Sequence, residues 1–128
     1  MNPSIFKAYD IRGIYPDQIN EDGAVQIGKA CLKIFGKGKI VVAHDIRHGS
    51  ETMAKKVAEN MNQGSNQVIF VGLSTTPMFY FLVNKLQAVG GCMITASHNP
   101  KNYNGFKIVR SGGEAVSGIA IQEIINTL

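Results

Sequence analysis

Apolar positions along the chain follow two alternating patterns, one typical of helices and one typical of buried strands. Apolar residues recur at helical spacing within 21–35, 50–64 and 117–128, and Thr76-Pro77 is typical of a helix start, since proline is tolerated there. Short apolar runs lie between these segments. They predict strands at 39–43, 67–71 and 91–95, and a fourth candidate at 106–109, which we expect at an edge of the sheet.

Polar residues and glycines mark the ends of the predicted helices. Asn20 is suited to cap the first helix, Ser50 to cap the second, and Ser117 to open the last. Gly36 and Gly64 are suited to end the first two helices, because glycine adopts the backbone conformations that stop a helix. These boundaries divide the chain into repeated strand–helix–strand units.

Such units predict an α/β fold: a three-layer αβα sandwich with a mixed, mostly parallel sheet and an edge strand, built as a single domain from residues 1–128. Loops that follow parallel strands gather at one edge of the sheet, where ligands bind in folds of this class. The loops after the first three predicted strands contain Arg47, Thr76 and Ser97. We therefore expect these three residues near a common rim.

Bulk composition narrows the possible function classes. The 128 residues contain no apolar run long enough to span a membrane and no signal-peptide pattern, so we expect a cytoplasmic protein without a membrane partner. The formal net charge of +4 suits an anionic ligand, but no basic stripe interleaved with aromatic residues indicates nucleic-acid binding. Cys31 and Cys92 lack the paired spacing of a zinc site, and we expect both to be small buried hydrophobic residues.

The most distinctive polar segment follows the strand predicted at 91–95. It presents the hydroxyl of Ser97 beside the imidazole of His98, with the ammonium of Lys107 further along. Two interpretations of Ser97 stay open on the residues alone: a turn serine that bonds its own backbone, or a serine that carries a reacting oxygen. A serine hydrolase is disfavoured, because the chain has no Gly-x-Ser-x-Gly motif.

Four cationic or potentially cationic side chains could surround an anionic group at Ser97: Arg12, Arg47, His98 and Lys107. Arg12 could clamp phosphoryl oxygens with its guanidinium, and Lys107 lies in an alternating strand pattern that could turn it toward the same cleft. The alternatives are an exposed turn arginine, an exposed strand lysine and a histidine that only supports the loop.

Four motifs occur in order along nearly the whole chain: Phe6–Gly13, Asp45–Arg47, Gly72–Pro77, and the serine loop Thr95–Pro100 with its continuation Tyr103–Lys107. Together they resemble the α-D-phosphohexomutase family, in particular the N-terminal domain of its bacterial phosphomannomutase/phosphoglucomutase branch. Four ordered matches are far more specific than any one of them. The serine loop alone is distinctive, because ordinary turn chemistry does not select serine, histidine, asparagine and proline in a row.

The resemblance implies that Ser97 carries the phosphoryl group being transferred, and that Arg12, His98 and Lys107 act with it in catalysis. It implies contacts to substrate or phosphate for five residues, namely Tyr9, Arg12, Arg47, Asn99 and Lys107.

The resemblance also implies Mg²⁺ as a cofactor, bound in part through the phosphate on Ser97, and an activator of the glucose 1,6-bisphosphate type. The family's other magnesium ligands lie on an aspartate-rich loop that this chain lacks. Asp10 and Asp45 are the nearest carboxylates by loop placement, and we expect each to bond backbone or arginine instead of metal.

The implied reaction is interconversion of hexose 1-phosphate and hexose 6-phosphate, with mannose or glucose as the sugar, through a bisphosphorylated intermediate. We expect the chain to be the N-terminal domain of a longer enzyme, inactive alone, whose partners are a phosphosugar and the downstream domains of the same protein. The alternative is a non-catalytic phosphosugar-binding or regulatory domain. The complete motif from Ser97 to Lys107 favours the enzyme.

Overall fold

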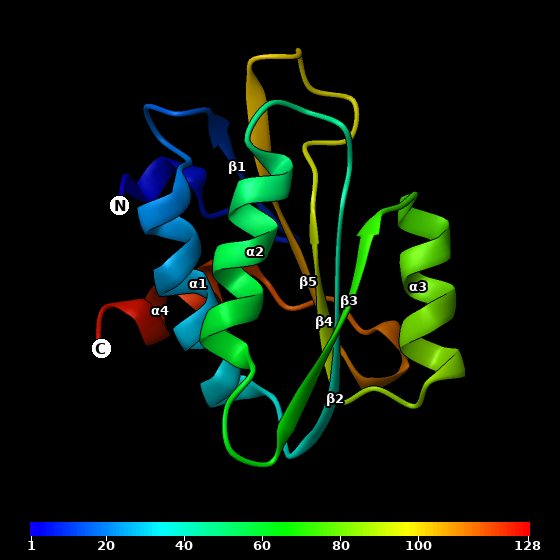
Figure 1. The fold of residues 1–128 in the computed structure, drawn as a ribbon. Coiled ribbons are helices and arrows are strands. Elements are labelled where there is room, and N and C mark those ends of the chain that lie inside the picture. Colours follow the sequence, from blue (N-terminus) through cyan, green and yellow to red (C-terminus); the bar gives the residue numbers. More distant parts are fainter.

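Five strands form one mixed sheet in the order β1-β5-β4-β2-β3 (Figure 1). The computed structural model describes residues 1–128, and its strands are β1 (Ile11–Ile14), β2 (Gly38–His44), β3 (Asn66–Leu73), β4 (Gly90–Ile94) and β5 (Tyr103–Arg110). Strands β3, β2 and β4 are parallel, whereas β5 is antiparallel to both of its neighbours, β4 and β1. The three parallel strands confirm the prediction from the apolar runs.

Helices cover both faces of the sheet and complete the three predicted layers (Figure 1). One face carries α1 (Glu21–Ile34), α2 (Ser50–Met61) and α4 (Gly118–Ile125), and the other carries α3 (Thr76–Lys85). Two short 3-10 helices, η1 (Pro3–Ile5) and η2 (Ser111–Gly113), precede β1 and follow β5. No helix has both the length and the apolar character needed to cross a membrane.

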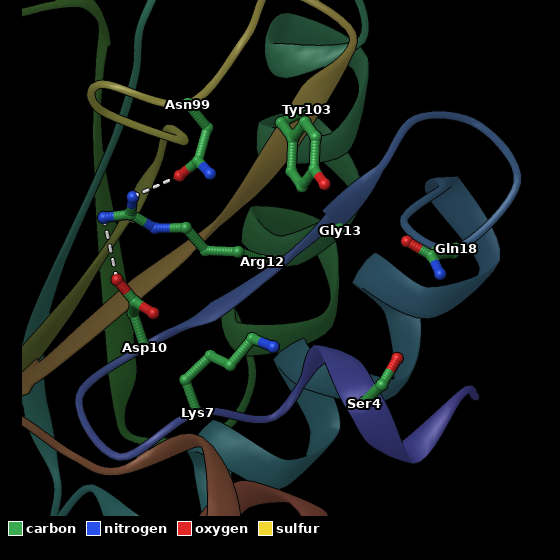
Figure 2. Close-up of a pocket in the computed structure, with 8 residues that line it drawn as sticks. All are labelled: Ser4, Lys7, Asp10, Arg12, Gly13, Gln18, Asn99 and Tyr103. Carbon is green, nitrogen blue, oxygen red and sulfur yellow. Dashed lines mark hydrogen bonds and ion pairs between the residues drawn. The ribbon is translucent and has the colours of Figure 1, made fainter.

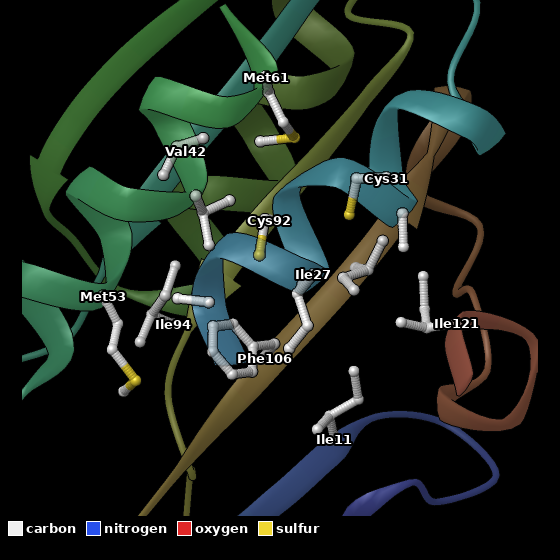
Figure 3. Packing of buried hydrophobic residues seen from close by; sticks show 14 of the residues in the cluster. Ile11, Ile27, Cys31, Val42, Met53, Met61, Cys92, Ile94, Phe106 and Ile121 are labelled. Atoms are coloured by element: carbon white, nitrogen blue, oxygen red, sulfur yellow. The ribbon is translucent and has the colours of Figure 1, made fainter. Parts of the chain in front are cut away.

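The larger part of the core lies between the sheet and the three helices α1, α2 and α4. It contains 21 buried residues, among them Ile27 of α1, Met53 of α2 and Phe106 of β5 (Figure 3). Cys31 and Cys92 lie inside this core, as predicted, and burial raises the pKa of the Cys31 thiol to about 12. A smaller cluster of seven buried residues lies under α3.

The predicted helix caps are correct in two cases and wrong in one. The side chains of Asn20 and Ser117 accept hydrogen bonds from the first turns of α1 and α4. The N-cap of α2, however, is Gly49 with φ +86°, and the Ser50 hydroxyl is turned away to donate to Asp45. Glycine is required at position 49, because a Cβ there would overlap the ring of Tyr15.

The prediction of an edge position for the fourth strand was wrong. Strand β5 lies inside the sheet, between β4 and the short strand β1, and the edges are β1 and β3. Strand β1 has only four residues, too few to show an alternating pattern, so its pairing with β5 could not be foreseen. The two strands approach closely at Gly105, where a Cβ would overlap the carbonyl of Ile11.

Candidate active site

Ser97 lies in the loop that follows the carboxyl end of β4, where an α/β sheet places its ligands. It is exposed and has φ +52°, in the left-handed region that non-glycine residues rarely adopt and that costs about 1 kcal/mol or more. Its N–H donates to Thr95 Oγ1 at 3.0 Å, and the N–H of Asn99 donates to the Ala96 carbonyl at 3.0 Å. The tight turn therefore presents the serine to solvent.

Asp10 joins two cations that come from neighbouring strands. Register pairs Ile11 with Phe106, so Arg12 and Lys107 both project to the sheet face opposite the larger core. The carboxylate of Asp10 lies 2.8 Å from Arg12 Nη2 and 3.8 Å from Lys107 Nζ. All three side chains are largely buried, which strengthens their electrostatic interaction.

Arg12 links this charge cluster to the serine loop. Its Nη1 donates to the Ala96 carbonyl at 3.0 Å and to Asn99 Oδ1 at 2.5 Å. Figure 2 shows the guanidinium lying between Asn99 and Asp10. The Arg12 Nε is buried without a hydrogen-bond partner. Two of the residues predicted to contact substrate or phosphate, Arg12 and Asn99, thus lie side by side, and their contacts to a ligand stay predictions.

A cavity of about 490 Å³ opens beside Arg12 (Figure 2). Its lining is almost entirely polar: Ser4, Lys7, Asp10, Arg12, Gly13, Gln18, Asn99 and Tyr103. Two cations and one carboxylate give it a net positive charge, which suits a phosphorylated ligand. Lys7, Gln18 and Tyr103 were not singled out from the sequence as cavity residues, although Lys7 and Tyr103 lie within the recognised motifs.

Arg47 reaches the serine loop, but its donors are already occupied. Nη1 donates to the carbonyls of Pro100 and Tyr103, and Nη2 donates to those of Ser97 and Asn99. The remaining donor, Nε, lies 3.5 Å from a carboxylate oxygen of Asp45. A guanidinium has five N–H groups, so none is left for a phosphate in this arrangement. The predicted phosphate contact of Arg47 stays a prediction.

Tyr9 and His98 remain apart from these contacts. Tyr9 is 78% exposed and His98 is exposed beside Ser97, and neither side chain makes a hydrogen bond within the chain. Both are free to meet a ligand. Their predicted roles in substrate contact and catalysis, like those of Ser97 and Lys107, stay predictions.

The two carboxylates expected to bind arginine do so: Asp10 pairs with Arg12, and Asp45 pairs with Arg47. No group of three or more His, Cys, Asp or Glu side chains is arranged to hold a metal ion. The chain's own residues therefore do not fit a complete magnesium site, and a contribution from the phosphate of Ser97 stays a prediction.

A second cavity, of about 800 Å³, lies beside the loop between β2 and α2. There Tyr15 donates to Glu21 Oε2 at 2.7 Å, and Thr52 donates to the same oxygen. The hydrogen bond to Glu21, together with desolvation, raises the pKa of Tyr15. Desolvation alone would raise the pKa of Glu21, but the hydrogen bonds from Thr52 and Tyr15 outweigh it and the pKa is lowered.

The sequence analysis missed one buried polar group, the pair Ser50 and Asn104. Both side chains are fully buried, and Asn104 Nδ2 donates to Ser50 Oγ at 2.9 Å. The only available signal was an asparagine inside the motif Tyr103–Lys107, near the start of a strand.

The chain was compared with known families and structures. The family model described as "Phosphoglucomutase/phosphomannomutase, alpha/beta/alpha domain I" matches residues 3–128. A protein of Xanthomonas campestris pv. campestris (strain B100) described as "Phosphohexose mutases" is 43% identical over 112 residues, which cover 88% of this chain and 25% of that protein. A phosphomannomutase of Klebsiella pneumoniae is 44% identical over 113 residues, covering 88% of this chain and 72% of that protein.

Among solved structures, a phosphoglucomutase/phosphomannomutase family protein from Burkholderia thailandensis matches with a TM-score of 0.83 and 33% sequence identity. The match covers 98% of this chain and 30% of that protein. The chain thus spans about a quarter of the length of the Xanthomonas relative and less than a third of the solved structure.

Proposed function

The chain belongs to the phosphoglucomutase/phosphomannomutase family as its α/β/α domain I, and from this premise we propose that it is the phosphoryl-carrying domain of a phosphohexomutase. The full-length enzyme would interconvert hexose 1-phosphate and hexose 6-phosphate, with mannose or glucose as the sugar. The names of the relatives support an isomerase of this class.

One observation carries the proposal: Ser97 is exposed, strained and held at the carboxyl end of β4 beside a cationic cluster. A non-glycine residue kept at positive φ is stable only where the surrounding contacts determine it, and such residues concentrate at functional sites. A phosphoserine would bring about −1.5 to −2 charges and so requires nearby cations. Arg12 and Lys107 against Asp10 leave one net positive charge on this side of the loop.

In the proposed first step, the bond between phosphorus and Ser97 Oγ breaks as a sugar hydroxyl oxygen bonds to phosphorus. The proton that the sugar hydroxyl loses is transferred to Ser97 Oγ, so the step ends with a neutral serine and with no net gain or loss of protons. The product is a sugar bisphosphate, which reorients so that its other phosphate returns to Ser97 by the same route. Because the transfer makes few covalent demands on the protein, positioning and charge stabilisation supply most of the catalysis.

We assign the charged groups by their placement. The ammonium of Lys107 is proposed to stabilise the transferring phosphoryl group or to shuttle the sugar hydroxyl's proton. Arg12, fixed by Asp10 and Asn99, is proposed to hold phosphoryl oxygens at the mouth of the polar cavity. His98 and Tyr9 are proposed to contact the phosphate and the sugar, because His98 is exposed in the serine loop and Tyr9 is exposed within the motif Phe6–Gly13.

Magnesium, when bound, would neutralise charge on the phosphoryl group. Asp10 and Asp45 are committed to arginines, so we propose that the other ligands come from outside residues 1–128. Unphosphorylated 1–128 should then bind Mg²⁺ no better than about millimolar, because the ion keeps its water unless several fixed oxygens replace it. Titration calorimetry measures this directly, and a stoichiometric micromolar site would contradict the proposal.

The phosphoserine is tested by intact mass and peptide mapping of the full-length enzyme. We expect one phosphate on the peptide that contains Ser97, and we expect it to disappear on incubation with hexose phosphate. Ser65→Ala, in an exposed turn, is the control and should behave as the wild type. A non-catalytic phosphosugar-binding domain would carry no phosphate that transfers to the sugar.

We also propose that residues 1–128 fold cooperatively but have no mutase activity alone, because the chain covers only a quarter of its longer relatives. A thermal melt and a coupled assay with glucose 1-phosphate check both parts. Measurable conversion by the 128-residue chain would show that the active site is complete within it.

A further inference from the structure

We propose that a polar relay, Asn104–Ser50–Asp45–Arg47, buried at its inner end, positions the serine loop, and that Arg47 acts through that loop instead of on the phosphate. The four residues are therefore positioning residues. The proposal rests on the proposed function for its effect on turnover, whereas its effect on the loop stands on geometry alone.

The outer end of the relay is the guanidinium of Arg47. Four backbone carbonyls accept hydrogen bonds from it, those of Ser97, Asn99, Pro100 and Tyr103, at distances between 2.6 and 3.1 Å. These carbonyls span the loop from its serine to the first residue of β5. One side chain from another loop thus closes the serine loop onto the body of the domain. Hydrogen bonds from a charged donor are roughly twice as strong as neutral ones.

The next member, Asp45, fixes the direction of Arg47. Its Oδ1 accepts the backbone N–H of Arg47 at 2.9 Å, and its Oδ2 lies 3.5 Å from Arg47 Nε. The carboxylate therefore holds both the backbone and the side chain of the arginine. Its Oδ1 also accepts a hydrogen bond from the hydroxyl of Ser50 at 2.5 Å, which connects Asp45 to the buried residues of the relay.

The inner end consists of two fully buried polar residues. Ser50 Oγ accepts from Asn104 Nδ2 at 2.9 Å, and the same Nδ2 donates to the carbonyl of His48 at 3.1 Å. The Oδ1 of Asn104 accepts the N–H of Gly105 at 2.9 Å. Because Asn104 is the second residue of β5, the relay holds the serine loop at its β5 end as well as through its carbonyls.

Stability alone gives no reason for a polar network in this place. Buried polar groups are often no better than apolar residues of the same shape, whereas a half-paired network is costly. What the network does supply is a fixed geometry. Misplacement of a reacting group by about 1 Å can cost about 10²-fold in rate. A relay that holds the strained Ser97 turn in one position would prevent such a loss.

Arg47→Lys separates this role from a direct phosphate contact. Lysine keeps the positive charge and binds phosphate well as a point charge, but its three donors cannot reach four carbonyls. Ser50→Ala cuts the relay further inward without changing any charge. Asp45→Asn is a milder variant, because it keeps an acceptor at the same position, and it serves if the other two fail to fold.

The experiment measures two quantities on the full-length enzyme. In hydrogen–deuterium exchange, we expect peptides covering 95–104 to exchange about tenfold faster in Arg47→Lys and Ser50→Ala, as for the loss of one or two hydrogen bonds. In steady-state kinetics, we expect kcat to fall about 10²-fold with little change in KM for the hexose phosphate.

Ser117→Ala is the matched control. It removes the N-cap of α4, which packs against α1 in the larger core, and leaves the serine loop untouched. It should lower the melting temperature without changing loop exchange or kcat.

Wild-type loop exchange in Arg47→Lys or Ser50→Ala would overturn the proposal. A raised KM with an unchanged kcat in Arg47→Lys would instead assign Arg47 to phosphate binding. If phosphate transfer from Ser97 is never observed, the proposed function fails, but hydrogen–deuterium exchange still tests whether the relay holds the serine loop.

Discussion

The two faces of the sheet differ in what covers them. The face under α1, α2 and α4 is closed by an apolar core of 21 residues, whereas α3 covers a cluster of only seven on the other face. On the same face as α3, strands β1 and β5 carry Arg12 and Lys107, which both pair with Asp10. Charge is thus concentrated on the part of the sheet that no helix covers.

The same strands serve both faces. Along β5, Phe106 and Ile108 are buried in the larger core, and Lys107 between them projects to the polar side. Along β1, Ile11 belongs to the core and its neighbour Arg12 to the charge cluster. Adjacent residues therefore divide between stability and the proposed chemistry, and substitutions can separate the two.

The largest effect on turnover is expected at Ser97, in the loop between β4 and β5. Ser97→Ala in the full-length enzyme should lower turnover by several orders of magnitude, because the covalent route through the serine oxygen is lost. The melting temperature should change little, since the side chain is exposed and makes no hydrogen bond through its hydroxyl. Near-normal mutase activity in this variant would refute the assignment of Ser97 as the phosphoryl carrier.

On the polar face, Lys107→Met should lower turnover by about 10²- to 10⁴-fold, the usual contribution of a positioned proton-transfer group. Methionine keeps the apolar stem, and Asp10 keeps its closer partner Arg12, so the free energy of unfolding should change by no more than about 0.5 kcal/mol. Activity assays and urea unfolding on the same preparations check both statements. Equal losses of activity and stability would remove the distinction between the faces.

On the helix face, Phe106→Ala should show the reverse pattern. The ring is 1% exposed within the larger core, and its removal should lower the free energy of unfolding by about 3–5 kcal/mol. The measurement is urea unfolding of residues 1–128. A loss below about 1 kcal/mol would mean that the core collapses around the missing ring, contrary to close packing.

The sequence predicted the repeated part of the fold well and the pairing of short segments poorly. Apolar runs at 39–43, 67–71 and 91–95 mark three parallel strands, and the structure confirms each. Strands β2 and β4 are buried, whereas β3, at the edge of the sheet, is partly exposed. The position of β5 depends on β1, a four-residue strand whose Arg12 and Gly13 resemble a turn. Local patterns carry no information about a partner that is too short to have a pattern.

At the site, the motifs identified residues, but the partners of each residue came only from the structure. Arg12 donates to Asn99, a contact that the motifs did not predict. Four loop carbonyls accept hydrogen bonds from Arg47, whose predicted phosphate contact stays a prediction. Every residue has a backbone carbonyl, so the residue types in the sequence could not show which carbonyls accept hydrogen bonds from Arg47. Asn104 was missed because its burial depends on the tertiary fold and cannot be read from the residue type.

The smallest effect on the free energy of unfolding is expected at Tyr15, which precedes α1 and has no proposed part in catalysis. Its hydroxyl donates to Glu21, and both side chains keep much of their contact with solvent, so Tyr15→Phe should cost only about 0.5 kcal/mol near pH 7.

The pH dependence of this cost follows from the two shifts. The folded pKa of Glu21 is lowered, so its contribution is present above its ordinary value of 4.5 and is lost as the pH falls through the folded pKa. The folded pKa of Tyr15 is raised, so its contribution is present below 10.0 and is lost as the pH rises through the folded pKa. Urea unfolding of Tyr15→Phe and wild type should therefore differ at neutral pH and converge in acid. Tyr80→Phe, in α3, has no such hydroxyl partner and is the control. An identical difference at neutral and acid pH would show that the Tyr15 hydroxyl does not contribute through the ionised carboxylate of Glu21.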